Sequence, residues 1–171
     1  MTVQQNLGSA CLLVLMFGAP ALAASPIPRT LQDLSGDAEV VVVGTVTERQ
    51  SRFNDDRTLI LTDTTLRVEE TLAGQAGAWV TFSEYGGIVG DRGLVVSGLP
   101  QYREGDRVLL FLCRDFLDLL RTCGASQGKL ELRTTAEGIV RARGLMAGGR
   151  IDSTLQELRA TIPAARTGGQ P

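Results

Sequence analysis

The sequence contains no histidine, a single lysine (Lys129), and only one Trp, two Tyr and five Phe residues. Without imidazole the chain lacks the commonest general base at neutral pH and the commonest zinc ligand, so a Ser-His-Asp hydrolase is excluded. No G-x-S-x-G nucleophile motif occurs either. The net charge of −2 and the few aromatics argue against nucleic acid as a partner. We therefore expect a protein without a cofactor or a metal.

Charged residues are absent before Arg29, and residues 11–24 form an apolar run that ends in small residues. The run is shorter than the roughly 20 residues that a membrane-spanning helix needs. The spacing Ala21-Leu22-Ala23 is typical of a signal-peptide cleavage site. We expect residues 1–23 to be a signal peptide and the mature protein to be secreted or periplasmic, with no integral membrane span. The alternative is a buried N-terminal helix, because the first ten residues carry no Lys or Arg.

Cysteine is scarce, and two cysteines remain after the expected cleavage, Cys113 and Cys123. An even number in an exported chain predicts a disulfide. Closing so short a loop is worth roughly 2.5–3 kcal/mol in the chain-entropy account. The alternative is a pair of free thiols in the core.

Strand signals dominate the mature sequence. Val40–Val43 is a run of four β-branched residues, which favours a strand buried on both faces. A long strand is expected over 58–72, where the apolar phase switches and predicts a bulge or bend. A third strand is expected at 79–83, and the apolar run 108–112 predicts a central, covered strand. Further strands are expected at 129–133 and from 139.

Two helical patterns complete the fold prediction. Thr30 is expected to cap one short turn, and Leu155, Leu158 and Ile162 follow helical spacing near the C-terminus, with Ser153 as N-cap. The strand pattern is typical of a small sandwich or a partly closed barrel. The prediction is a mainly β fold, a small five- to seven-stranded OB-like barrel over residues 24–150 with a C-terminal amphipathic helix packed on it over 151–165. Residues 166–171 are expected to be a disordered tail.

A resemblance to known proteins rests on three blocks of the chain. Residues 37–115 resemble a group of small secreted bacterial proteins of unknown function. The blocks are DAEVVVVGTV (37–46), TLRVEETLAG (65–74) and GLPQYREGDRVLLFL (98–112). The order of elements is also similar to the netrin-type OB barrel of tissue inhibitors of metalloproteinases. That resemblance implies a five-stranded barrel. It does not imply their inhibitory mechanism, because the expected mature N-terminus, Ala24-Ser25, lacks their zinc-chelating cysteine.

Motifs that carry chemistry elsewhere are interpreted here as structural. Ser126 and Lys129 fit S-x-x-K, but the lysine opens an alternating strand and the partner motifs are missing. The sequence Asn54-Asp55-Asp56 offers too few oxygen ligands for calcium, and a hairpin turn is expected. Glu69 and Glu70 are neighbours on a strand, so they should point to opposite faces.

The glycine-rich segment 84–98 is the remaining candidate for function. It contains no phosphate-binding loop, so it is either a structural loop or a partner-binding loop. Tyr85, Arg92 and Tyr102 flank it or lie in it, and these residue types are common interface anchors. They are the candidate binding residues.

The function predicted from these observations is an exported, non-catalytic binding module, a protein-interaction or protease-inhibitor-like domain. Its expected partner is a protein, with a secreted protease as one option. A structural protein of the cell envelope and a hydrolase that uses carboxylates alone are the alternatives. A glycosidase would need two carboxyl groups facing each other across a cleft.

Overall fold

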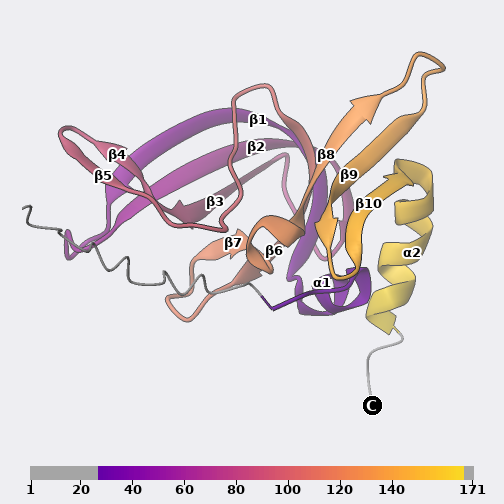
Figure 1. Cartoon of the computed structure of the whole chain (residues 1–171), viewed down its shortest axis with the longest axis horizontal. Helices are drawn as coiled ribbons and strands as arrows, with labels where there is room; N and C mark the ends of the chain where they lie inside the picture. Colours follow the sequence, from indigo (N-terminus) through magenta and orange to yellow (C-terminus); the bar gives the residue numbers. More distant parts are fainter. Residues whose placement is uncertain (1–26, 168–171) are drawn as a thin grey trace, which may run out of the picture.

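The computed structural model describes residues 27–167 of the chain (Figure 1). The expected signal peptide, including Cys11, lies outside the described residues. The helices are α1 (Leu31–Asp37), the 3-10 helix η1 (Ala125–Gly128) and α2 (Leu155–Thr167). The strands are β1 (Val40–Phe53), β2 (Ile60–Ala73), β3 (Trp79–Tyr85), β4 (Gly87–Val89), β5 (Arg92–Leu94), β6 (Arg107–Arg114), β7 (Leu120–Thr122), β8 (Lys129–Thr134), β9 (Val140–Met146) and β10 (Gly149–Thr154).

One antiparallel sheet with the order β10-β9-β8-β6-β1-β2-β3 organises the protein, and β7 adds to β6 beside β8. Its central strands β1 and β6 are covered on both faces. Because side chains alternate along a strand, Val41 and Val43 of the valine run enter one core and Val40 and Val42 enter another. The predicted central strand is confirmed, since residues 108–112 are fully buried.

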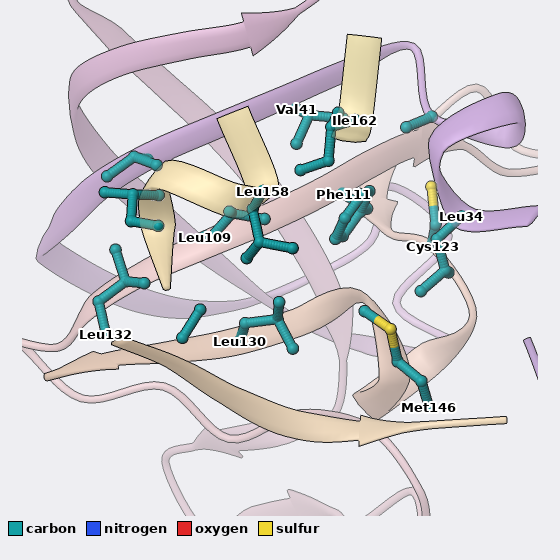
Figure 2. Packing of buried hydrophobic residues seen from close by; sticks show 14 residues of the cluster. Leu34, Val41, Leu109, Phe111, Cys123, Leu130, Leu132, Met146, Leu158 and Ile162 are labelled. Carbon is teal, nitrogen blue, oxygen red and sulfur yellow. The ribbon is translucent and has the colours of Figure 1, made fainter. Parts of the chain in front are cut away.

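The first core lies between the sheet and the two α-helices (Figure 2). Leu158 and Ile162 of α2 pack in the same cluster as Leu109 and Phe111 of β6, and Leu34 joins it from α1. Burying an aliphatic or aromatic side chain of this size contributes about 1.5–3 kcal/mol relative to leaving it exposed. This cluster therefore fixes both helices on one face of the sheet.

The second core lies on the opposite face, where β1, β2 and β3 curve strongly (Figure 1). Val46, Leu66 and Phe82 come from these three strands, and Leu110 comes from β6. Tyr102 is also part of this cluster, and its ring meets Phe82 edge to face at 5.0 Å between centroids. The second core ends part-way along the three strands, which leaves room for the site described below.

The helix predictions are confirmed in position but not in every boundary. Thr30 caps α1, and its side chain and that of Asp33 form a capping box. In α2 the capping box is one residue later than expected, because Thr154 rather than Ser153 accepts from the Glu157 N–H. The helix also continues to residue 167, although Pro163 lies inside it.

The chain after Pro163 has its own anchor. The Arg166 guanidinium donates to the Ala38 carbonyl at 2.8 Å, which holds the last turn against the start of β1. The expectation of a disordered tail from residue 166 is therefore wrong for residues 166 and 167, and residues 168–171 lie outside the described residues.

The hydrogen-bonded strands do not close into the expected OB-like barrel. The ladder is open, with β3 and β10 at its two ends, and ten strands replace the expected five to seven within residues 27–167. The reason is that β8, β9 and β10 extend the sheet away from its curved half, while β3 meets β7 through the Glu84 side chain and not through a backbone ladder. The backbone N–H of Thr122 on β7 donates to the Glu84 carboxylate on β3 at 3.0 Å.

The predicted bulge is found in β2, where two register shifts against β1 leave Glu69 and Leu72 without a partner residue in that strand. A third shift, between Val46 and Glu48, leaves the extra residue in β1. An extra residue in β1 increases its local bend, which lets the β1–β2 ribbon curl over the second core.

Cys113 and Cys123 are joined by a disulfide, as predicted, with their Cα atoms 5.4 Å apart. The bond ties β6 to the residue after β7. Among residues 27–167, no helix has the length and apolar character needed to cross a bilayer.

Candidate functional site

The three residues predicted for binding have different surroundings. Tyr85 ends β3 and is half-buried, and its hydroxyl donates to Asp115 at 2.9 Å. Tyr102 is only 3% exposed, and its hydroxyl hydrogen-bonds Thr122 at 2.6 Å. Arg92 is exposed on β5. Tyr102 therefore acts as a core residue rather than as the surface anchor that the sequence suggested.

The two tyrosines nevertheless line one cavity, whereas Arg92 does not. Burial raises the pKa of Tyr102 well above its ordinary value, and the nearby Glu84 charge adds to this effect. Burial and the hydrogen bond to Asp115 also raise the pKa of Tyr85. Both phenols therefore stay neutral at physiological pH and serve as hydrogen-bonding groups.

The glycine-rich segment forms a hairpin that we call the flap, residues 86–98. It contains β4 and β5 and stands out from the curved half of the sheet (Figure 1). Gly86, Gly87 and Gly98 at its two ends all have positive φ, a region that side chains disfavour. At Gly87 a Cβ would lie 2.4 Å from the hydroxyls of Ser51 and Thr62. Glycine is therefore required where the flap leaves the sheet.

Under the flap lies a cavity of about 710 Å³, which we call the flap cavity. This volume is within the range of about 300–1,000 Å³ that is usual for ligand sites. Its walls from the flap and the following segment are largely apolar. Those wall residues are Ile88, Leu94, Val95, Val96, Leu99 and Pro100.

The floor of the flap cavity is polar and is built by cross-strand rows on the concave face of β1, β2 and β3. One row is Ser51, Thr62 and Glu84, since Ser51 pairs with Thr62 and Thr62 with Glu84. The next row begins with Arg49 opposite Thr64. Directly opposite residues of an antiparallel pair have Cβ atoms about 4.5–5.5 Å apart on one face. The floor thus begins where the second core ends.

Most of these floor groups are satisfied within the protein. The Thr62 hydroxyl donates to the Gly86 carbonyl at 2.6 Å and hydrogen-bonds Ser51 at 2.9 Å. The Thr64 hydroxyl differs, because it is buried and has no hydrogen-bond partner among the described residues. A buried hydroxyl without a partner is costly. Less than 1 Å² of the Thr64 oxygen is accessible, so a ligand group reaches it only when the side chains around it shift.

A charged cluster contacts two residues that line the cavity, Glu84 and Tyr85. Arg121 of β7 pairs with Glu84 at 3.2 Å and with Asp115 at 3.3 Å, and its guanidinium lies over the Tyr85 ring at 4.0 Å. Burial alone would raise the pKa of Asp115, but hydrogen bonds from Leu117, Leu119, Tyr85 and Arg121 lower it below the usual value. Asp115 is therefore ionised at neutral pH and belongs to a structural ion-pair network.

The rim of the cavity exposes apolar side chains. Ile88 and Val95 on the flap are 73% and 93% exposed, and Val96 is partly exposed. Phe116 and Leu117 are also exposed, in the β6–β7 turn that Tyr85 joins through Asp115. Grouped apolar residues on a surface mark interaction sites more often than single ones do.

A second cavity of about 590 Å³ lies on the other side of residues 99–101. It is lined by both carboxylates and cations, among them Lys129, Glu131 and Asp152. A hydrogen bond from Arg141 lowers the pKa of Asp152, and Arg143 reinforces this effect. Asp152 is thus an ion-pair partner and a poor proton donor.

Three polar residues that the sequence indicated as structural, Asn54, Glu69 and Glu70, have partners within the protein. The Asn54 side chain accepts from the N–H groups of Thr58 and Leu59 at 2.9 Å, so it organises the β1–β2 turn. Glu69 pairs with Arg107 and Glu70 with Arg159, on opposite faces of β2. Among the residues that the structure describes, no cluster of three or more potential metal ligands occurs.

The sequence reasoning missed Arg49, Thr64 and Glu84 as cavity residues. Thr62 and Thr64 have the same parity as Leu66, so hydroxyl groups on the core-facing side of a strand were the available signal.

Comparison with family models, curated proteins and solved structures gives no match for this chain, so its own residues carry the functional argument.

Proposed function

We propose that the protein is an exported, non-catalytic binding module that holds a protein partner with the flap and the flap cavity. The observation that carries this proposal is the placement of Ile88 and Val95 at the rim of a cavity whose floor holds buried polar groups. Exposed aliphatic residues around a polar-floored pocket provide both contact area and orientation for a partner.

The cavity chemistry supports binding over catalysis. Among residues 27–167, Glu84 is the one carboxylate-bearing residue that lines it, whereas hydrolysis of a glycoside needs a pair. That carboxylate already accepts from Thr122 and pairs with Arg121. Hydroxyl groups such as that of Ser51 line the flap cavity, but the sequence contains no histidine that could activate them as nucleophiles.

The proposal retains an OB-like barrel as the description of the curved half of the sheet. It is supported by the contact between β3 and β7 through Glu84 and Thr122, which brings the end of the ribbon back toward β6. A secreted protease is the partner that the resemblance to netrin-type inhibitors suggests. Export is supported by the Cys113–Cys123 bond, because disulfides persist in oxidising compartments.

The test is capture of the partner by the immobilised mature protein, from periplasmic extract and culture supernatant, compared with two variants. Val95→Asp places a charge on the 93% exposed flap position and is expected to abolish capture without changing stability. Ile139→Asp is the matched control, because Ile139 is exposed beside the β8–β9 turn, away from the flap (Figure 1). Capture that is equal for wild type and Val95→Asp would overturn the proposal.

A further inference from the structure

The flap cavity contains two polar side chains that the protein itself leaves without partners. The Thr64 hydroxyl is buried, with Thr64 only 1% exposed, and has no hydrogen bond among the described residues. Arg49 stands directly opposite it on β1, lines the same cavity and has no ion pair within residues 27–167. The two side chains share the concave face, so they can act on the same ligand group.

The chemistry of this pair selects an anionic acceptor. A guanidinium only donates hydrogen bonds, and a threonine hydroxyl can donate one. A carboxylate accepts both, and its planar geometry matches the fork of an arginine. The nearby Glu84 would repel a carboxylate, but its charge is compensated by Arg121 at 3.2 Å and by the Thr122 N–H at 3.0 Å.

The walls define what carries the carboxylate. The side chains that line the cavity from residues 88–100 are aliphatic or proline, with Leu94, Val96 and Leu99 among them. They suit an aliphatic stem rather than a sugar or a nucleotide. Outside the mouth, Ile88 and Val95 remain largely exposed, and only a ligand much larger than the cavity would cover them.

We propose that the flap cavity binds the C-terminal carboxylate of a partner chain that ends in an aliphatic residue. The carboxylate accepts from Arg49 and Thr64, the last side chain packs against Leu94 and Leu99, and the preceding residues run out under the flap over Ile88. This deepens the proposed function and rests on it, because it names the chemical group by which the protein partner is recognised. Capture of a terminal carboxylate is a recurrent mode of peptide recognition.

The experiment is an NMR titration of the mature protein with the peptide acetyl-Gly-Ala-Val-Leu bearing a free carboxylate, and with the same peptide amidated. The acid is expected to shift the amide signals of β1, β2 and the flap, and to bind at least about tenfold more tightly than the amide, as loss of a charge-assisted hydrogen bond predicts. Sodium octanoate is the third probe, and it reports whether a free aliphatic acid suffices.

Three variants assign the effect to the two side chains. Arg49→Gln is expected to weaken binding of the acid about tenfold or more, and Thr64→Val a few-fold. Thr64→Val should leave the melting temperature unchanged or raised, because the hydroxyl has no partner in the free protein. Arg67→Gln is the matched control, since Arg67 lies opposite Thr45 and Trp79 and is absent from the cavity lining.

Equal binding of acid and amide, no binding of the acid, or equal losses in Arg49→Gln and Arg67→Gln would each overturn the proposal. The proposal would also be overturned if octanoate binds and the peptide acid does not, because the ligand would then be a free aliphatic acid. If Val95→Asp loses capture of the partner and the peptide does not bind, the proposed binding function is retained and only the recognition of a C-terminal carboxylate is refuted.

Discussion

Replacing Glu84 with alanine should destabilise the protein by about 3 kcal/mol. Glu84 is 5% exposed, so its removal leaves the buried N–H of Thr122 without its acceptor, at a cost of about 1–3 kcal/mol. Arg121 also loses one of its two carboxylates, although Asp115 remains at 3.3 Å and limits that loss. Glu84→Gln keeps an acceptor oxygen for Thr122 and should cost about 1 kcal/mol.

The assay is urea unfolding of both variants and of Glu104→Ala, an exposed carboxylate in the turn before β6. Glu104→Ala is expected to remain within about 0.5 kcal/mol of wild type. Amide exchange should show a selective loss of protection at Thr122 in Glu84→Ala. A Glu84→Ala variant as stable as Glu104→Ala, with Thr122 still protected, would refute the reasoning that Glu84 joins β3 to β7.

Three further changes should alter stability. Replacing Cys113 and Cys123 with serine should lower the free energy of unfolding by about 2–3 kcal/mol in chemical denaturation, a loss that reductant should reproduce in the wild type. Because the pKa of Asp115 is lowered in the folded state, its ionised carboxylate contributes to the free energy of unfolding above pH 3.8, and this contribution is lost as the pH falls below that value. Asp115→Asn should therefore make the free energy of unfolding depend less on pH in the acid range. Thr154→Ala should lower the free energy of unfolding by about 1 kcal/mol, because α2 loses its N-cap. Ser153→Ala should leave this free energy nearly unchanged, and thermal melts of both variants check the difference.

Local patterns predicted the elements whose burial is set by their own residues. The valine run and residues 108–112 became the two central strands, because unbroken β-branched or aliphatic runs need cover on both faces. Thr30 and Asp33 formed the expected cap because a capping box involves only neighbours in sequence.

Features that depend on distant contacts were missed. The helix was expected to end at residue 165, but Arg166 holds the last turn to Ala38, more than a hundred residues earlier in the chain. The sheet is open because of where β8, β9 and β10 pack, and the alternation of apolar residues in a strand does not specify which strand it pairs with. Tyr102 was expected to be a surface anchor because it flanks the glycine-rich segment and tyrosine is common at interfaces, yet its ring packs on Phe82 of β3.

The candidate site shows the same difference between features set by local sequence and features set by distant contacts. The glycine-rich segment was recognised from composition, and it is the flap. Its cavity was not recognised, because Arg49, Thr64 and Glu84 come from three strands and meet only through register.

Binding of a partner by the flap is tested by hydrogen exchange of the protein with and without its captured partner, measured residue by residue. Added protection is expected on the flap, residues 86–98, on the concave ends of β1 and β2 beneath it, and on the β6–β7 turn. Protection confined to the β8–β9 turn or to the second cavity, with the flap exchanging as in the free protein, would contradict it.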